Sequence, residues 1–184
     1  MNKKRILVLS GFILIAALSR VFPHPYNFAP MGAMAIFGAA YFTNRKLAFI
    51  LPLLAFFVSD LLVNNILYSG FYGGFTLFTP GFYWMYGSVA LIVLAGIFIM
   101  KKVNMKTIIG GSLAASIIFF LVTNFGAWLG NPMYPQTLEG LLMSYIAGIP
   151  FFHYTVAGDL VYSGVMFGAF EYAKFKVPAL QPIK

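Results

Sequence analysis

The segment Arg20–Tyr41, RVFPHPYNFAPMGAMAIFGAAY, separates two apolar runs and decides how the chain begins to fold. Three prolines fall in eight residues, from Pro23 to Pro30, and they exclude a continuous helix because proline lacks a backbone N–H and restricts the residue before it. The apolar runs on either side, about 6–22 and 31–43, are therefore separate helices joined by a turn. The second run is short and rich in small residues, so it must either be buried by protein or be extended by the turn.

The composition of the whole chain is that of a membrane protein. Of its 184 residues, 61% are hydrophobic and only 9% are charged. Apolar runs of about 17 to 23 residues recur, which is the length that roughly 30 Å of hydrocarbon requires. We therefore predict an all-α membrane protein, a six-helix transmembrane bundle in which residues 1–184 form a single domain. The predicted spans are about 6–22, 31–43, 47–63, 81–100, 107–129 and 151–173.

Basic residues mark one side of this bundle. Eleven of the twelve Lys and Arg residues lie at the ends of apolar runs that would share a side. The positive-inside rule then predicts that both termini are cytoplasmic, as expected for a multi-pass protein of the cell inner (cytoplasmic) membrane. The four groups are Lys3, Lys4 and Arg5; Arg45 and Lys46; Lys101, Lys102 and Lys106; and Lys174, Lys176 and Lys184.

The same pattern limits the partners and the chemistry. The formal net charge of +8 consists of these topology signals, which also meet anionic lipid headgroups, so we expect a lipid bilayer and no nucleic acid as partner. The chain has no cysteine, which excludes disulfides, thiolate metal sites and thiol nucleophiles. It also has no glycine-rich phosphate loop and no Ser/His/Asp set recognisable by spacing. We therefore predict that the protein is not an enzyme.

The first apolar run has a second interpretation. Its basic start, its apolar stretch and its small residues Ala17 and Ser19 are also features of a signal peptide. The apolar run continues through Val21 and Phe22, which favours a retained span. The sequence leaves both interpretations open.

Two acidic residues are expected inside the bundle. Asp159 lies about 12 Å along the last span, where an unpaired charge costs several kcal/mol, so it should face the protein interior. Asp60 and Asn64 share one face of the third span at the i, i+4 spacing. Arg20, the basic residue outside the four groups, lies at a similar depth. Either Arg20 forms a structural ion pair with Asp60 or Asp159, or these groups contact a ligand.

Other polar and aromatic residues gather toward the predicted outer face. His24 lies in the proline-rich turn with Asn27 beside it, and neutral imidazole binds transition metals. No carboxylate or second histidine is spaced for a conventional zinc site. The predicted outer segment 64–80 is dense in aromatics, more than anchoring needs, and could line a pocket for a large planar or amphipathic ligand. The segment 130–150 is expected to hold a short interfacial helix or lid at 141–148.

The predicted substrate-binding residues are therefore spread over several spans. They are His24, Asn27, Asp60, Asn64, Tyr72, Tyr83, Asn124, His153 and Asp159.

The core P-H-P-x-N-F-x-P within Arg20–Tyr41 resembles the first two helices of substrate-binding (S) components of energy-coupling-factor vitamin transporters. The likeness is strongest to the small six-helix cobalamin-uptake group and related uncharacterised membrane proteins. It implies an outward-open pocket with His24 and Asp60 in it, the loop between Asn64 and Trp84 over the ring, and His24 as a ligand to the corrin cobalt. The cysteine that some cobalamin-binding relatives place over the cobalt has no counterpart here.

The resemblance also implies what the protein does. We expect uptake of a vitamin-type cofactor precursor, with cobalamin or another corrinoid as the transported ligand and no permanently bound cofactor. An energy-coupling transmembrane and ATPase module is the expected partner. Two alternatives remain: a membrane-embedded enzyme that uses His24 or His153 with Asp60 or Asp159, and a structural or assembly protein whose polar residues lock the bundle.

Overall fold

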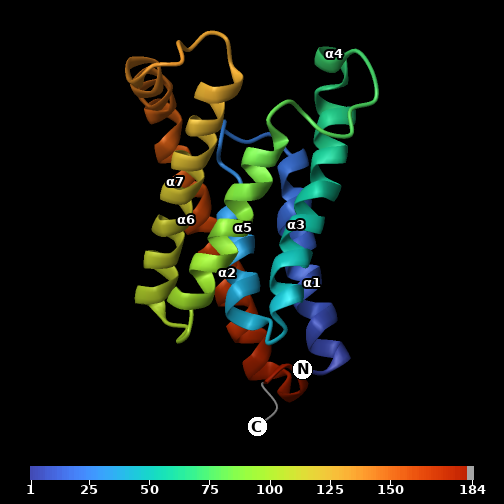
Figure 1. Cartoon of the computed structure of the whole chain (residues 1–184). Coiled ribbons are helices and arrows are strands. Elements are labelled where there is room, and N and C mark those ends of the chain that lie inside the picture. Colours follow the sequence, from blue (N-terminus) through green and yellow to red (C-terminus); the bar gives the residue numbers. More distant parts are fainter. Residues whose placement is uncertain (182–184) are drawn as a thin grey trace.

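The computed structural model describes residues 1–181, and every regular element in that range is helical. The elements run as a bundle of elongated helices with both described ends of the chain at one end of it (Figure 1). The basic residue Lys184 lies outside the described residues. The main helices are α1 (Lys3–Leu18), α2 (Met31–Tyr41), α3 (Arg45–Leu62), α5 (Phe82–Ile99), α6 (Met105–Gly130) and α7 (Leu138–Lys176).

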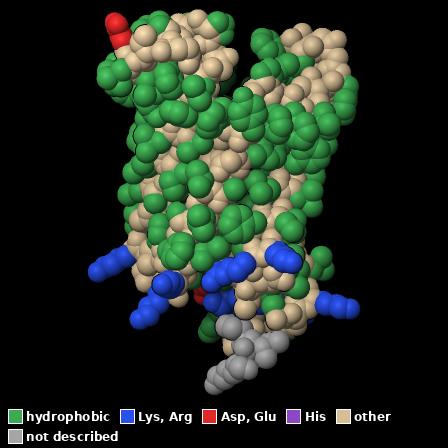
Figure 2. Space-filling model, viewed as in Figure 1, with side chains coloured by type: hydrophobic (Ala, Val, Ile, Leu, Met, Phe, Trp, Pro, Cys, Tyr) green, Lys and Arg blue, Asp and Glu red, His purple; other side chains and the backbone are tan. Residues whose placement is uncertain are grey.

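Four of the described helices are long and apolar enough to cross a membrane. They are α3 with its extension to Leu67, α5, α6 and α7. Lys and Arg side chains gather at the end of the bundle where the chain termini lie (Figure 2). We call this the basic end and the opposite end the open end. The charge asymmetry expected from the sequence is thus present in three dimensions.

Helix α2 is the centre of the bundle. Ten of its eleven residues are buried, and it contacts α1, α3, α5, α6 and α7. Small residues permit this close packing: a side chain at Gly96 of α5 would lie 2.8 Å from Ala39, and one at Gly38 would lie 2.9 Å from Pro52 of α3. Of the two alternatives for this short apolar run, burial by protein and extension by the turn, the structure shows burial by protein.

The first turn of α2 lies inside the bundle, where its free backbone N–H groups need an acceptor. The residue before the helix, Pro30, supplies no side-chain cap. The carboxylate of Asp159 on α7 does: it accepts a 3.2 Å hydrogen bond from the Ala33 backbone N–H and a 2.7 Å bond from the Ser116 hydroxyl of α6. An anionic group at a helix N-terminus is also favoured by the helix dipole. Asp159 therefore joins α2, α6 and α7.

Two glycines make this junction sterically feasible. A Cβ on Gly32 would lie 2.5 Å from both carboxylate oxygens of Asp159. A Cβ on Gly158 would lie 2.9 Å from the backbone nitrogen of Ala29, at the end of the proline-rich turn. The pair Gly158–Asp159 of α7 thus packs directly against both the turn and the start of α2.

The open end differs from the predicted loops in two places. Instead of a loop from Asn64, a π-helical turn (Val63–Leu67) continues α3 and a short helix α4 (Ser69–Tyr72) follows. Asn65 stabilises this extension because its amide donates to the carbonyls of Leu61 and Thr76 and accepts from the Thr76 N–H.

The second difference concerns the segment predicted to carry a separate helix at 141–148. These residues belong to α7, which starts after a Thr137 side-chain cap and includes Pro150. Proline removes one intrahelical hydrogen bond, and long helices in apolar surroundings tolerate it. The lid predicted at this place is thus the first part of α7.

Gly32→Ala is expected to destabilise the protein by about 1–3 kcal/mol, because the added methyl group overlaps the Asp159 carboxylate. Gly164→Ala is the matched control on α7, since no atom lies within 4 Å of the added methyl. Alanine favours a helix over glycine, so this control should be neutral or slightly stabilising. Thermal unfolding of the purified variants in one detergent measures both. Equal stability of the two variants would contradict the close approach of Asp159 to α2.

Candidate ligand-binding cavity

A cavity of about 820 Å³ opens between the helix ends at the open end. Its lining comes from Arg20 and the proline-rich turn that follows it, the π-helical extension of α3, α6 and α7, with single residues of α2 and α5. Figure 2 shows the molecule hollowed at this end between two groups of projecting side chains. Because α2 has only eleven residues, it rises about 16 Å, roughly half of a bilayer core, and the space beyond its first turn is left to the turn and the cavity.

The cavity has an apolar wall with few polar groups, as small-molecule sites usually have. Rings of Phe120 and Phe152 from α6 and α7 pack at a centroid distance of 5.0 Å, and Tyr26 of the turn contacts Phe151 edge to face. Polar side chains interrupt this surface at Arg20, His24, Asn27, Tyr68, Thr123, Asn124, Tyr134 and Ser144.

Three of the predicted binding residues line this cavity: His24, Asn27 and Asn124. The His24 Nδ1 lies 2.9 Å from the Pro25 carbonyl oxygen. Since a carbonyl only accepts hydrogen bonds, Nδ1 is the donor in this contact, and in a neutral imidazole with this tautomer Nε2 keeps its lone pair for another partner. Asn27 holds a left-handed backbone conformation, with φ 63°, which asparagine tolerates better than most residues.

Asn124 shapes the cavity wall between α6 and α7. Its amide donates 2.8 Å to the Phe120 carbonyl, and Ser144 donates 3.1 Å to the Asn124 backbone carbonyl. A side chain at Gly148 would lie 2.5 Å from the Asn124 amide oxygen. The absence of a side chain at Gly148 therefore lets α7 approach this amide closely.

The structure does not bring the other predicted binding residues to the cavity. His153 is exposed with its ring beside Tyr154, and Asp159 lies under the first turn of α2. Tyr83 lines a separate cavity of about 600 Å³ between α5 and α6. The lining also lacks Asp60, Asn64 and Tyr72.

These predicted residues do not line the cavity because residues at the same depth in the bundle project from different helix faces. The aromatic segment at 64–80 follows the same rule: Phe71 and Phe75 are 81% and 80% exposed, whereas Tyr68 lines the cavity. Most of this segment therefore forms an outer surface and does not cover the cavity.

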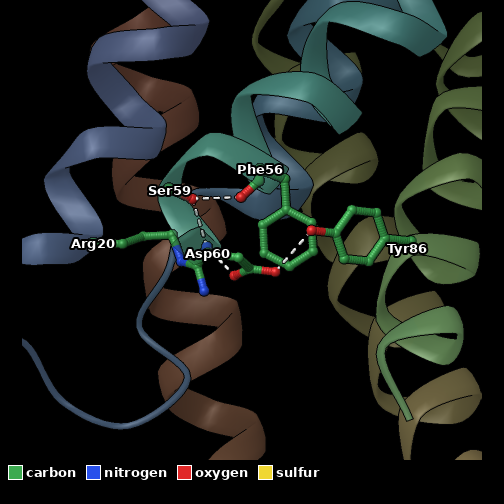
Figure 3. Close-up of polar contacts among 5 residues, drawn as sticks. All are labelled: Arg20, Phe56, Ser59, Asp60 and Tyr86. Carbon is green, nitrogen blue, oxygen red and sulfur yellow. Dashed lines mark hydrogen bonds and ion pairs between the residues drawn. The ribbon is translucent and has the colours of Figure 1, made fainter. Parts of the chain in front are cut away.

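Arg20 pairs with Asp60 and not with Asp159. The Arg20 Nη1 lies 2.7 Å from Asp60 Oδ1 and 2.6 Å from the Ser59 hydroxyl, and the Tyr86 hydroxyl donates 2.9 Å to Asp60 Oδ2 (Figure 3). The guanidinium carbon also lies 4.7 Å from the centroid of the Phe56 ring. This cluster connects the 3₁₀ turn Ser19–Val21, which carries Arg20, to α3 and α5.

Sequence reasoning missed several of the partners. Ser59 and Tyr86 complete the Arg20–Asp60 cluster, and Ser116 completes the Asp159 cap. The spacing of Ser112 and Ser116, four residues apart on one helix face, was an available signal for a buried polar stripe. The aromatic run that contains Tyr86 gave no comparable indication of a partner for the Tyr86 hydroxyl.

The clusters do not combine into an acid–base or metal arrangement. Neither His24 nor His153 is hydrogen bonded to Asp60 or Asp159. Within residues 1–181 no group of three or more His, Cys, Asp or Glu side chains is placed to hold a metal ion. The polar groups of the cavity are suited to binding and orienting a ligand.

Fold and cavity together define an all-helical protein of membrane type with a ligand-sized cavity at the end away from its basic residues. Residues 1–180 match the family of unknown function DUF6580, and the chain belongs to that family. The chain matches no curated protein and no solved structure.

Asp60→Ala is expected to destabilise the protein by about 3–5 kcal/mol, because it leaves the mostly buried Arg20 guanidinium without its carboxylate. The double variant Arg20→Met with Asp60→Leu removes both charges and should recover most of that loss. Unfolding in mixed micelles of increasing SDS content measures both variants against the wild type. If Asp60→Ala were as stable as the wild type, the ion pair would not be what holds the turn to α3.

Proposed function

We propose that this protein captures a vitamin-type cofactor precursor from the outer face of the inner membrane and carries it toward the cytoplasm. The observation that carries the proposal is the cavity of about 820 Å³ at the open end, opposite the basic residues. Its size lies in the range of about 300–1,000 Å³ typical of small-molecule sites. Aromatic rings supply area for a large planar body, and a few polar groups supply orientation.

Cobalamin or another corrinoid is the ligand that we propose first. The sequence likeness of Arg20–Tyr41 to the cobalamin-uptake group supports it, and so does the place of His24 on the cavity lining, where its Nε2 has no hydrogen-bond partner among residues 1–181. Imidazole is a good ligand for a transition metal such as the cobalt that a corrinoid brings with it. We assign the protein no chemical step. An energy-coupling transmembrane and ATPase module remains the proposed partner, supported by the same likeness.

We also propose six membrane-spanning helices, α1, α2, α3, α5, α6 and α7, with both termini in the cytoplasm. The gathering of Lys and Arg at the end that holds the termini supports this orientation. Burial by the surrounding helices makes a span of only eleven residues in α2 acceptable, since its ends do not face lipid.

Purified protein in detergent is expected to bind aquacobalamin or diaquacobinamide with micromolar or tighter affinity, and the visible corrin spectrum should shift as the His24 imidazole replaces an axial water on the cobalt. His24→Ala should weaken binding about tenfold and abolish the spectral shift, because the imidazole no longer reaches the cobalt. The matched control is His153→Ala, which removes a histidine outside the cavity and should bind as the wild type does. Folded wild-type protein that binds neither compound would overturn the corrinoid assignment.

The orientation has its own test, which the cysteine-free sequence makes simple. Glu139→Cys at the open end should react with a membrane-impermeant maleimide in intact spheroplasts, because that end would face outward. Lys102→Cys, in the turn between α5 and α6 at the basic end, should react only after the membrane is permeabilised. Mass spectrometry of the purified variants measures the extent of labelling. The reverse pattern would contradict the proposed orientation.

A further inference from the structure

The cavity contains one permanently charged side chain. Among the described residues that line it, Arg20 is the only Lys, Arg, Asp or Glu. An arginine is a costly residue in a wall of aromatic and aliphatic side chains unless its charge is balanced. Asp60 balances it from behind, at 2.7 Å, without itself lining the cavity. The ion pair as a whole is therefore neutral, and of its two residues only Arg20 lines the cavity.

The guanidinium is held in one position by three contacts. Its Nη1 is shared between Asp60 and Ser59, and its carbon lies 4.7 Å from the centroid of the buried Phe56 ring. Asp60 is in turn held by the Tyr86 hydroxyl. A planar donor group fixed in this way loses little conformational freedom when a ligand binds to it.

The other terminal nitrogen of Arg20 is free for a ligand. Within residues 1–181 Nη2 has no hydrogen-bond partner, and it is not among the buried polar atoms that lack one. In Figure 3 the contacts drawn from Arg20 to Ser59 and Asp60 leave from one terminal nitrogen, and none is drawn to the other. Two N–H donors on a fixed, positively charged group therefore remain available beside the cavity.

From this geometry we propose that Arg20 anchors the captured molecule through a neutral oxygen acceptor, of the kind found in an amide carbonyl. A neutral acceptor fits because Asp60 already balances the charge of Arg20, and a second carboxylate would add an unbalanced negative charge to an apolar wall. The ligand class is then a large, mostly planar molecule that carries carbonyl side groups. This inference rests on the proposed function, because it takes the cavity as the place of capture, and it adds the ligand group that the cavity selects.

The first test needs no knowledge of the natural ligand. The probe is p-hydroxyphenylglyoxal, a flat aromatic with two neutral carbonyl groups that modifies arginine covalently. The chain has three arginines, and mass spectrometry resolves them: Arg5 is buried, Arg45 is exposed at the basic end, and Arg20 lines the cavity. Purified wild-type protein in detergent is used throughout.

The expected result is a modification rate at Arg20 that saturates with probe concentration, because the cavity binds the probe before it reacts. The rate at Arg45, the control in the same molecule, should rise in proportion to concentration. An unreactive Arg20, or one whose rate rises in proportion as at Arg45, would overturn the anchor. If the modification rate at Arg20 saturates in protein that binds no corrinoid, the role of Arg20 as an anchor stands and the corrinoid assignment is wrong.

The second test uses dicyanocobinamide, which carries amide side groups. Arg20→Lys keeps a positive charge for Asp60 but loses the planar fork, so the fold should persist while affinity falls about 10- to 100-fold. Arg45→Lys is the matched control and should bind as the wild type does. Bound dicyanocobinamide should also slow modification of Arg20 and leave Arg45 unchanged. The contrary outcome has two parts: Arg20→Lys binds the corrinoid as well as the wild type does, and bound corrinoid does not slow the modification of Arg20. The role of Arg20 as an anchor would then be wrong, and the corrinoid assignment would stand.

Discussion

The bundle depends on an acceptor for the buried first turn of α2. A helix that begins inside an apolar bundle has backbone N–H groups that neither water nor lipid can satisfy. Asp159 meets this need from α7, with Ser116 of α6 as its second partner, and Gly32 leaves room for the carboxylate. One carboxyl group therefore relates three helices and determines the depth at which α2 starts.

The cavity follows from that depth. Because α2 occupies only the part of the bundle nearer the basic end, the proline-rich turn lies beyond its start, where His24 and Asn27 are exposed and line the cavity. Gly158 holds the end of this turn against α7. The Arg20–Asp60 pair holds its beginning against α3 and α5. The polar groups of the turn are thus placed on a supported segment, which suits them for orienting a ligand.

The ion pair and the cap illustrate two uses of a carboxylate in apolar surroundings. Asp60 is paired with a cation and with a phenolic hydroxyl, whereas Asp159 is satisfied by a helix N-terminus and a serine. From the sequence both residues are acids in the outer half of an apolar span. Which partner each one finds depends on the angular position of its side chain on its helix and on the neighbouring helices.

The sequence by itself determined the helical class, the positions of most helices and the gathering of basic residues at one end, and it left burial or extension by the turn as alternatives for the short second run. These properties follow from run length, proline placement and charge, which act locally along the chain. Only the tertiary structure decided that His24, Asn27 and Asn124 share a cavity while His153, Tyr83 and Asp159 lie outside it. The same holds for the choice of Asp60 as the partner of Arg20. The reason is that such groupings depend on how helices rotate and cross, and packing of small residues such as Gly32, Gly148 and Gly158 against distant side chains sets those rotations.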